Sequence, residues 1–297
     1  MSDDRAQAGR MALVTGGTDG IGREVAWGLA RAGHRVLIVG RDAQKGDRAA
    51  QKIRQTTGNP NVEFLPADLS LTRETRRLAD EVTSRWPRLN YLVHSAGIVR
   101  GRRELTDEGN ESNFAVNYLS RFVLTQRLLP LLKASGRPGG AARIVIVSGA
   151  AQKGTIYFDD VNLTSKFGVL RVVGQFCRAN DIFTVEQARR LTGSATSNVT
   201  ITCLKMGVVK TNIRSEFPKW MKLLVPMVMD PLLGQTPQEA AAPVLSLLLS
   251  GDYEETTGAL FMKIKKFKRL TPNAGVTAPE IGKRLWTLSQ RLADQFS

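Results

Sequence analysis

Thr15-Gly16-Gly17-Thr18-Asp19-Gly20-Ile21-Gly22 is the stretch that decides the fold, because it joins an apolar run at 11–14 to an amphipathic segment. The apolar run predicts a buried parallel strand, and the spacing of apolar residues after the glycines predicts a helix. A strand, turn and helix start of this kind bind a pyrophosphate. Gly16 permits the tight turn, Gly20 lets the backbone approach the phosphates, and Gly22 lets the helix pack close to the strand. The stretch therefore predicts a dinucleotide site, which also includes Thr18, Asp19 and Ile21.

The same alternation of strands and helices continues along the chain. Further strands are expected at 35–39, 62–65, 91–94, 143–147, 200–204 and 258–264. Helices are expected at 42–57, 73–85, 108–135, 170–191 and 237–249. This order predicts an α/β fold with a Rossmann-type doubly wound parallel sheet. We expect a single domain over 1–297, with a flexible N-terminus at 1–10.

The end of the second expected strand indicates which cofactor binds. NAD-binding units carry an acidic residue about 20 positions past the glycines, where it holds the ribose 2′-hydroxyl. Here Gly40 stands at that place, and the next residue is Arg41, whose guanidinium can pair with a 2′-phosphate. The sequence therefore favours NADP(H) over NAD(H), with an ordinary surface arginine as the alternative.

Two more strand ends extend the expected cofactor site, since ligands bind at the carboxyl ends of strands in such sheets. After the third strand, Asp68, which precedes Leu69, either accepts a hydrogen bond from the adenine amino group or caps the following helix. After the fourth strand, Ser95, Ala96 and Gly97 are small enough for the backbone to lie against the adenosine ribose.

Composition argues against several other kinds of protein. With two cysteines and two histidines, the chain has no disulfide framework, no metal-ligand spacing and little material for a Ser-His-Asp triad. No signal peptide and no apolar run long enough to span a bilayer are present, so we expect a cytoplasmic protein. The net charge of +15 is spread along the chain without a nucleic-acid-binding signature, and its one dense cluster lies at 263–269.

A Met-rich apolar segment, interrupted by proline, occupies 212–236 and is the expected helical lid of a substrate pocket, because methionine adapts to irregular shapes. Plain core is one alternative. A peripheral membrane contact is another, since Lys219 and Lys222 flank the apolar residues. As a lid, the segment predicts a small-molecule substrate that is bulky and apolar.

These motifs resemble those of the short-chain dehydrogenase/reductase family, in particular its retinol-dehydrogenase-like branch, over nearly the whole chain. The resemblance is carried by TGGTDGIG (15–22), VLIVGRD (36–42), ADLS (67–70), SAG (95–97), NYLSRF (117–122), RIVIVS (143–148) and ANDIFTVEQARRL (179–191). It implies that Asn117 is the family's structural and proton-relay asparagine, and that chains associate as homo-oligomers. It also implies that the nicotinamide side of the cofactor is wrapped by Gly207, Val208, Val209 and Thr211.

The family's proton-transfer residues are a serine, a tyrosine and a lysine four positions after the tyrosine, and this chain contains no Tyr-x-x-x-Lys. Matching the turn at 178–180 to the branch's Leu-Ala-Asn turn places Val173 at the tyrosine position and Cys177 at the lysine position. The catalytic serine falls on Gly149, with Ser148 displaced by one residue. Because valine cannot move a proton, the cofactor-binding residues are retained while the proton-transfer residues are replaced.

Three functions remain open from these residues. The first is a non-standard reduction, or a non-redox cyclisation or isomerisation, of the bulky apolar substrate. The second is ordinary NADP(H)-dependent carbonyl reduction with a relocated proton donor, for which the candidates are Ser148, Tyr118, Tyr157, Lys166 and Lys205. The third is a non-catalytic NADP(H)-binding protein.

Overall fold

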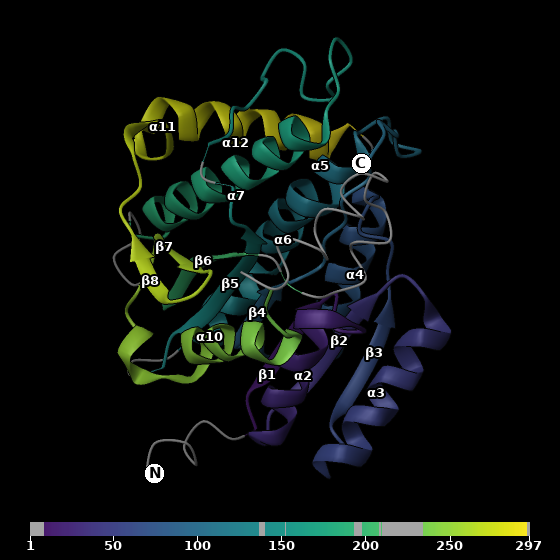
Figure 1. Cartoon of the computed structure of the whole chain (residues 1–297). Coiled ribbons are helices and arrows are strands. Elements are labelled where there is room, and N and C mark those ends of the chain that lie inside the picture. The colour runs from purple at the N-terminus through teal and green to yellow at the C-terminus, as the bar shows by residue number, and fades with distance from the viewer. Residues whose placement is uncertain are drawn as a thin grey trace.

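A computed structural model describes residues 9–136, 140–151, 153–192, 198–207, 209 and 234–295. Its centre is one sheet in the order β3-β2-β1-β4-β5-β6-β7-β8, parallel throughout except for the antiparallel pair β7 and β8 (Figure 1). The strands are β1 (Met11–Thr15), β2 (Arg35–Gly40), β3 (Val62–Pro66), β4 (Tyr91–His94), β5 (Ala142–Gly149), β6 (Val199–Met206), β7 (Ala259–Lys263) and β8 (Phe267–Leu270). The predicted single-domain doubly wound α/β fold is therefore confirmed.

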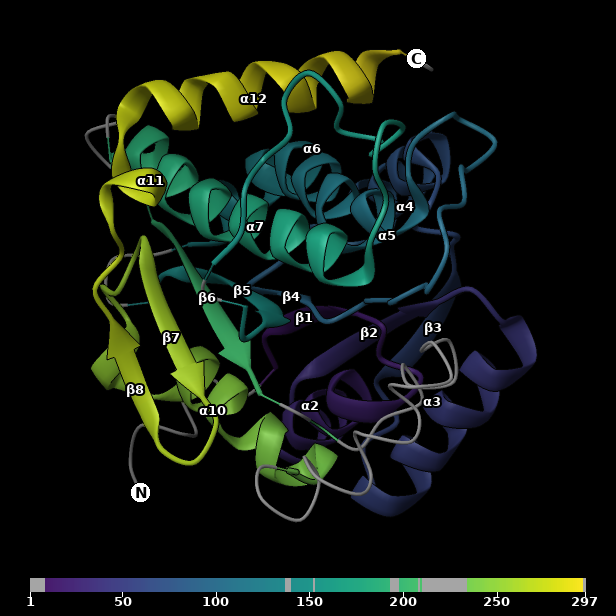
Figure 2. The same ribbon diagram turned by 45° about the horizontal axis from the view of Figure 1, so that its top comes forward.

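Helices cover both faces of the sheet (Figure 2). One face carries α2 (Gly20–Arg31), α3 (Ala43–Thr57) and α10 (Pro237–Leu249). The other carries α4 (Thr72–Arg85), α6 (Ser120–Ser135) and α7 (Val169–Thr192), and α12 (Pro279–Asp294) packs on α7 from outside. The shorter elements are α5 (Ser112–Phe114), the π-helix η1 (Ala115–Leu119), the 3₁₀-helix η4 (Gly251–Tyr253) and α11 (Ala274–Thr277).

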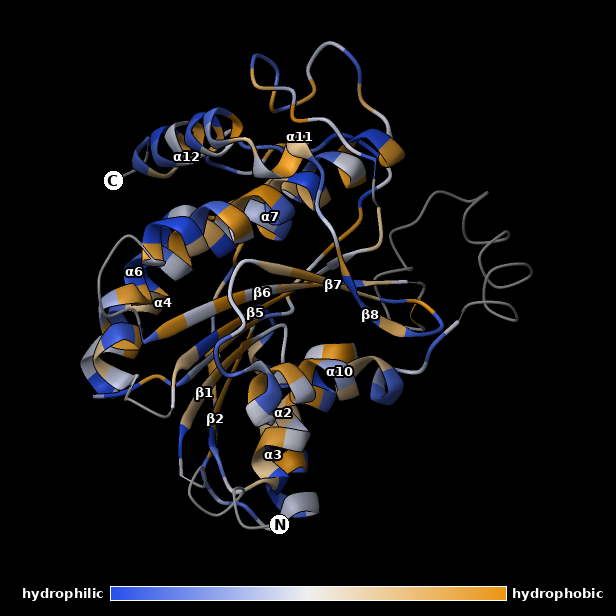
Figure 3. Cartoon of the chain, turned by 90° about the vertical axis from the view of Figure 1, so that its left-hand side faces the viewer, coloured by the Kyte–Doolittle hydropathy of each residue, from blue (hydrophilic) through white to orange (hydrophobic). Residues whose placement is uncertain are grey.

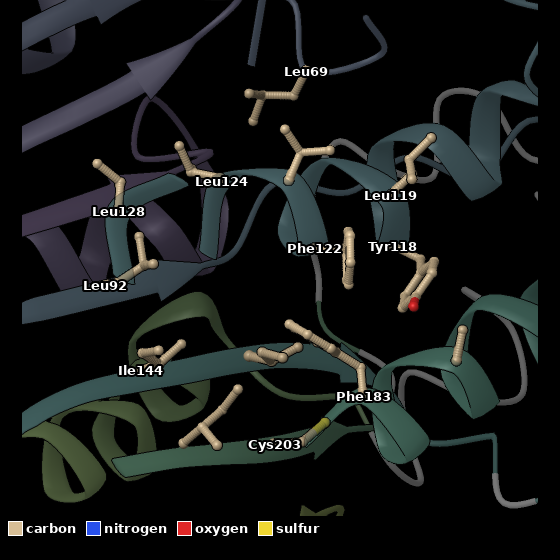
Figure 4. Packing of buried hydrophobic residues seen from close by; sticks show 14 of the residues in the cluster. Leu69, Leu92, Tyr118, Leu119, Phe122, Leu124, Leu128, Ile144, Phe183 and Cys203 are labelled. Carbon is tan, nitrogen blue, oxygen red and sulfur yellow. The ribbon is translucent and has the colours of Figure 1, made fainter. Parts of the chain in front are cut away.

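Each face of the sheet has its own apolar core, because side chains along a strand alternate between the two faces. On the α6 and α7 side, strand residues such as Leu92 and Ile144 meet Phe122 and Phe183 from the helices (Figure 4). In Figure 3 the central strands β5 and β6 are mostly hydrophobic, while α12 on the outside is mixed. The two buried layers hold the carboxyl ends of the strands in a fixed arrangement, and the candidate site lies there.

The last helix is attached to the rest of the fold by polar contacts as well as by apolar packing. The hydroxyl of Tyr118, in η1, lies 2.6 Å from the Ser289 hydroxyl on α12. The guanidinium of Arg76, on α4, donates to the Ala293 carbonyl at 2.6 Å. Helix α12 therefore ties together elements that are far apart in the sequence.

The structure differs from the sequence predictions at several element ends. The helix expected at 108–135 begins at Ser112 and passes through the π-helix before α6. The edge strand β8 and helix α12 were not expected. Gly9 and Arg10, in the stretch expected to be flexible, are attached to the fold, because Gly9 N–H donates to Gly33 and Arg10 to the Tyr91 hydroxyl. The lid predicted at 212–236 lies outside the described residues up to 233.

Candidate active site

The glycine turn between β1 and α2 leaves no room for side chains at Gly16, Gly17 and Gly22. Gly16 has φ +69°, and a Cβ there would lie 2.8 Å from the Ala96 Cα. A Cβ on Gly22 would lie 2.4 Å from the Gly16 carbonyl oxygen. The turn therefore packs closely against the segment that follows β4 and against its own helix α2, as a phosphate-binding turn requires.

Thr15, at the end of β1, joins the turn to the third part of the cofactor site. Its hydroxyl accepts hydrogen bonds from the N–H groups of Ser95 and Ala96, both at 3.2 Å, and donates to the Val93 carbonyl at 3.3 Å. Gly97 follows directly, so the SAG segment borders the glycine turn, and its contact with the adenosine ribose stays a prediction. Sequence reasoning missed the role of Thr15, although its place as the last residue of an apolar strand before the glycines was a usable signal.

Three charged residues, Asp19, Lys45 and Arg41, lie around the turn. Asp19 caps α2 by accepting from Gly20 N–H at 2.7 Å, and its other oxygen pairs with Lys45 at 2.6 Å. The lysine balances the carboxylate beside the predicted phosphate site. Arg41, directly after β2, is exposed and forms no ion pair with any described residue. Its guanidinium is therefore available to a ligand.

Gly40 is required by packing as well as by charge. A Cβ at Gly40 would lie 2.7 Å from the Thr18 methyl carbon, so an acidic residue does not fit there without moving the glycine turn. Thr18 and Ile21 are both half-buried in the turn. A larger residue at position 40 would therefore require the Thr18 side chain to shift.

Asp68 does not cap the next helix, which was one of its two predicted roles. Its carboxylate accepts from Ser70 N–H at 2.9 Å, and Leu69 beside it is buried in the core. The N-terminus of α4 is capped instead by Glu108, which accepts from the N–H and hydroxyl of Thr72 at 2.6 and 2.8 Å and from Arg73 N–H at 3.0 Å. Asp68 therefore remains a candidate for the adenine contact.

The nicotinamide side of the predicted site is described only in part. Gly207 N–H donates to the Lys263 carbonyl at 2.9 Å, and Val209 is buried and bridges to Gln235. Val208 and Thr211 lie outside the described residues.

At the carboxyl end of β5, Gly149 and Cys177, which the resemblance predicts at the family's serine and lysine positions, lie against each other. Ser148 and the Gly149 backbone lie close to the Cys177 sulfur and oppose part of the rise in its pKa. Asn180, one turn further along α7, donates to the Asn117 carbonyl at 3.0 Å and to the Phe176 carbonyl at 2.8 Å, and lies 3.4 Å from Ser148 Oγ. Burial raises the pKa of Cys177, so its thiol is protonated at neutral pH.

Asn117 lies inside the π-helix, where its side chain is fixed by backbone groups. Its Oδ1 accepts from Ile98 N–H at 3.2 Å, and its Nδ2 donates to the carbonyls of Ile98 and Asn113, both at 2.8 Å. π-helical turns are frequent at functional sites. Asn180 contacts both the Asn117 carbonyl and Ser148 Oγ, so Asn117 and Ser148 share one neighbour. Asn117 thereby links η1, α7 and the segment after β4.

A buried ion pair lies behind this cluster. Lys205 on β6 and Asp181 on α7 are 2.5 Å apart, with 1% and 6% of their side chains exposed. Lys205 is the register partner of Ser148 on the neighbouring strand, and Asp181 follows Cys177 by one helical turn. Burial raises the pKa of Asp181, and the Lys205 ammonium opposes that rise. A buried ammonium is therefore present next to the cluster, but it comes from β6 and not from α7.

Arg121, on α6, is a second buried cation near the same strand ends. Its guanidinium donates to the Val147 carbonyl at 2.9 Å and to the Ala96 carbonyl at 2.8 Å. Burial lowers its pKa to about 10. Arg121 thereby holds the end of β5 at a fixed distance from the SAG segment, which sequence reasoning did not foresee.

The other candidate proton donors lie elsewhere or at the surface. The Tyr118 hydroxyl is held by Ser289 on α12, and burial raises its pKa. Tyr157 is half-buried under the Arg171 guanidinium, and Lys166 is exposed. Val173 is half-buried against the core. Of the five candidates, Ser148 and Lys205 are the two that the structure brings together.

Within the described ranges, no group of three His, Cys, Asp or Glu side chains is placed to hold a metal ion. No helix in that part of the chain is both long and apolar enough to cross a membrane.

The chain is similar to known dehydrogenases over most of its length. The model of the family described as short chain dehydrogenase matches residues 10–222. Polyprenol dehydrogenase from Homo sapiens is 33% identical over 262 residues, which cover 88% of this chain and 79% of that protein. Retinol dehydrogenase 13 from Mus musculus is 33% identical over 289 residues, which cover 96% of this chain and 84% of that protein.

Solved structures show the same architecture. A protein of Mycobacterium paratuberculosis described as uncharacterized superposes with a TM-score of 0.76 at 25% identity, covering 97% of this chain and 94% of its own. The RhlG/NADP active-site complex from Pseudomonas aeruginosa superposes with a TM-score of 0.70 at 27% identity, covering 88% and 97%.

Proposed function

Since the chain belongs to the short chain dehydrogenase family and is an oxidoreductase of that fold, we propose that it transfers hydride between NADP(H) and a bulky apolar alcohol or carbonyl compound. In this proposal, the proton of the reaction is held by residues other than a tyrosine and lysine four positions apart. The observation that carries the proposal is the intact glycine turn beside Arg41, which forms no ion pair with a described residue, together with a buried Ser148–Lys205 neighbourhood. A cytoplasmic location and a homo-oligomeric state stay predictions.

The choice of NADP(H) rests on the end of β2. Gly40 provides no acidic side chain and packs closely against Thr18, and Arg41 follows with its guanidinium free of acidic partners among the described residues. A 2′-phosphate would meet a cation there and no carboxylate at position 40. Structural relatives include complexes with NADP and NADPH, which supports the same choice.

When bound, the nicotinamide supplies or accepts the hydride. The chain's own residues then have to hold the substrate oxygen and a proton. Ser148 is the hydroxyl nearest the family's serine position, and Asn180 lies 3.4 Å from it. The Lys205–Asp181 pair, on the strand and helix flanking Ser148, keeps an exchangeable proton on Lys205 Nζ or Asp181 Oδ2.

The substrate class rests on the relatives. Proteins that resemble this chain over most of their length are named polyprenol dehydrogenase and retinol dehydrogenase, and both names refer to long apolar alcohols. The Met-rich composition of 212–236 agrees with an apolar substrate. We therefore propose an isoprenoid-like alcohol, or its aldehyde, as the substrate.

The test is isotopic. The purified protein is incubated with retinal or a short polyprenal and NADPH deuterated at the reactive C4 position, and the product is analysed by mass spectrometry. We expect deuterium in the alcohol, and a lower transfer rate with unchanged NADPH affinity in Lys205→Met. Conversion of the substrate without deuterium or NADPH oxidation would support the non-redox alternative. NADPH binding with no conversion of any substrate would support a non-catalytic protein.

A further inference from the structure

The turn between β7 and β8 carries the densest positive charge in the described structure. The turn and the strand ends beside it have four lysines and one arginine within seven residues: Lys263, Lys265, Lys266, Lys268 and Arg269. None of them forms an ion pair with a described acidic residue, although other basic residues such as Arg77 and Arg85 each pair with two carboxylates. Lys265, Lys266, Lys268 and Arg269 are exposed. We call these five residues the hairpin cations.

Protection of the sheet edge does not explain all of this charge. β8 is the last strand of the sheet, and charged residues on an edge strand prevent pairing with other chains. Lys268 and Arg269 point to opposite faces of β8 and already serve that purpose. Lys263, Lys265 and Lys266 precede the edge strand, so their charge has another use.

The hairpin lies next to the nicotinamide end of the candidate site. Gly207, directly after β6, donates to the Lys263 carbonyl at 2.9 Å, and a Cβ on Gly207 would lie 3.3 Å from Ile264. Figure 2 shows the tips of β6 and β7 side by side at the same end of the sheet. A surface that binds the hairpin cations is therefore brought to the rim of the site.

We propose that the β7–β8 hairpin docks the protein on an anionic lipid surface, so that the apolar substrate enters from the bilayer. The proposal rests on the proposed function only for its account of the substrate. Four of the five cations are lysines, which are compact, strongly hydrated charges suited to a diffuse layer of headgroups, whereas recognition of a specific carboxylate favours the fork of arginine. Each basic residue near an anionic membrane strengthens binding by about fivefold.

The experiment measures sedimentation of the full chain with vesicles. One set contains phosphatidylcholine alone, and the other contains phosphatidylcholine and phosphatidylserine. We expect binding only to the second set, decreasing as salt is added. Lys265→Glu with Lys266→Glu should weaken that binding by at least tenfold. The matched control is Arg48→Glu with Lys52→Glu on α3, which changes net charge equally at two exposed positions and should retain binding.

Two results would overturn the docking surface. One is a wild-type chain that stays in the supernatant with phosphatidylserine vesicles at low salt, as expected if the hairpin instead meets an acidic protein. The other is an equal loss of binding in both double variants, which would make net charge the cause. Both results come from vesicle binding and not from turnover. A failure of the proposed oxidoreductase activity would therefore be distinguished from a failure of membrane docking. If that activity is present, the hairpin variant should lose turnover on vesicle-borne retinal and keep it on detergent-dispersed retinal.

Discussion

The sulfur of Cys177 lies 3.0 Å from the point that a Cβ on Gly149 would occupy. The resemblance predicts that these two residues stand where the family has its lysine and its serine. The thiol therefore fills the space in which a serine side chain would begin, and each replacement favours the other. Restoring the family's serine alone does not restore its site.

Substitution of Gly149 by serine tests this relationship. We expect Gly149→Ser to lower the free energy of unfolding by about 1–3 kcal/mol, because the new side chain is forced against the thiol. In a Cys177→Ala background the same substitution should cost clearly less. Urea denaturation of the four proteins gives the coupling energy. An equal cost in both backgrounds would show that the thiol is not the obstacle.

The buried ion pair gives a second prediction. Asp181→Asn leaves the Lys205 ammonium buried without its carboxylate, so we expect a loss of about 3–5 kcal/mol in the free energy of unfolding. Replacing both residues, as Asp181→Leu with Lys205→Met, should cost less than Asp181→Asn alone. The control is Asp80→Asn, which breaks the exposed pair with Arg127 and should cost less than about 1 kcal/mol. Similar losses at 181 and 80 would contradict the role given to burial.

The glycine turn provides a matched pair of substitutions. Gly16 and Gly58 have nearly the same φ, +69° and +71°, but a Cβ meets Ala96 at Gly16 and nothing within 4 Å at Gly58. Both Gly→Ala variants carry the strain of a left-handed residue, about 1 kcal/mol. Only Gly16→Ala should abolish NADPH binding measured by calorimetry. Full binding by Gly16→Ala would remove the turn from the cofactor site.

Arg41 decides between the two nicotinamide cofactors. Arg41→Ala should weaken NADPH binding by roughly ten- to a hundredfold, since a charged hydrogen bond to the 2′-phosphate contributes about 1.5–3 kcal/mol. NADH binding should change little, as should both affinities in the α3 variant Arg48→Ala. Equal effects on NADPH and NADH would show that Arg41 does not contact the 2′-phosphate.

Both cysteines should be inert in the folded protein. Burial raises the pKa of Cys177 and of Cys203. A thiol reagent at pH 8 should therefore detect no thiol until denaturant is added, and then two. Because the folded chain keeps these protons longer than the unfolded chain, stability should fall as pH rises above about 8.5. Cys177→Ala with Cys203→Ala should remove that part of the fall, and an unchanged pH dependence would assign it to other groups.

Signals that are local in the sequence predicted most of the fold. The apolar strands and the glycine turn have short-range patterns, and β4 and α10 have the bounds expected for them. β8 escaped prediction because Phe267–Leu270 is a charged edge strand without a buried alternation. The cap of α4 escaped prediction because Glu108 lies 36 residues from Thr72, so only the folded chain shows that they meet.

In the candidate site, too, local sequence patterns predicted some features, while others are seen only in the folded chain. The cofactor turn, the SAG segment and the place of Ser148 follow from strand ends in a parallel sheet. The Lys205–Asp181 pair and the Arg121 contacts join elements that are far apart in the sequence, so no local pattern predicts them. Lysine, aspartate and arginine are also rarely expected inside a core. The sequence could name Lys205 as a candidate but could not choose it over Lys166, because that choice depends on which side chain is buried beside Ser148.

The contact of Tyr118 with Ser289 has a consequence for biosynthesis. η1 carries Asn117 and is made before the middle of the chain, yet its hydrogen-bond partner on α12 lies almost at the end. While the ribosome still holds the last helix, the sheet can assemble but the phenol has no partner. The packing of η1 against α12 is thus completed only after Ser289 has been synthesised, 171 positions after Tyr118.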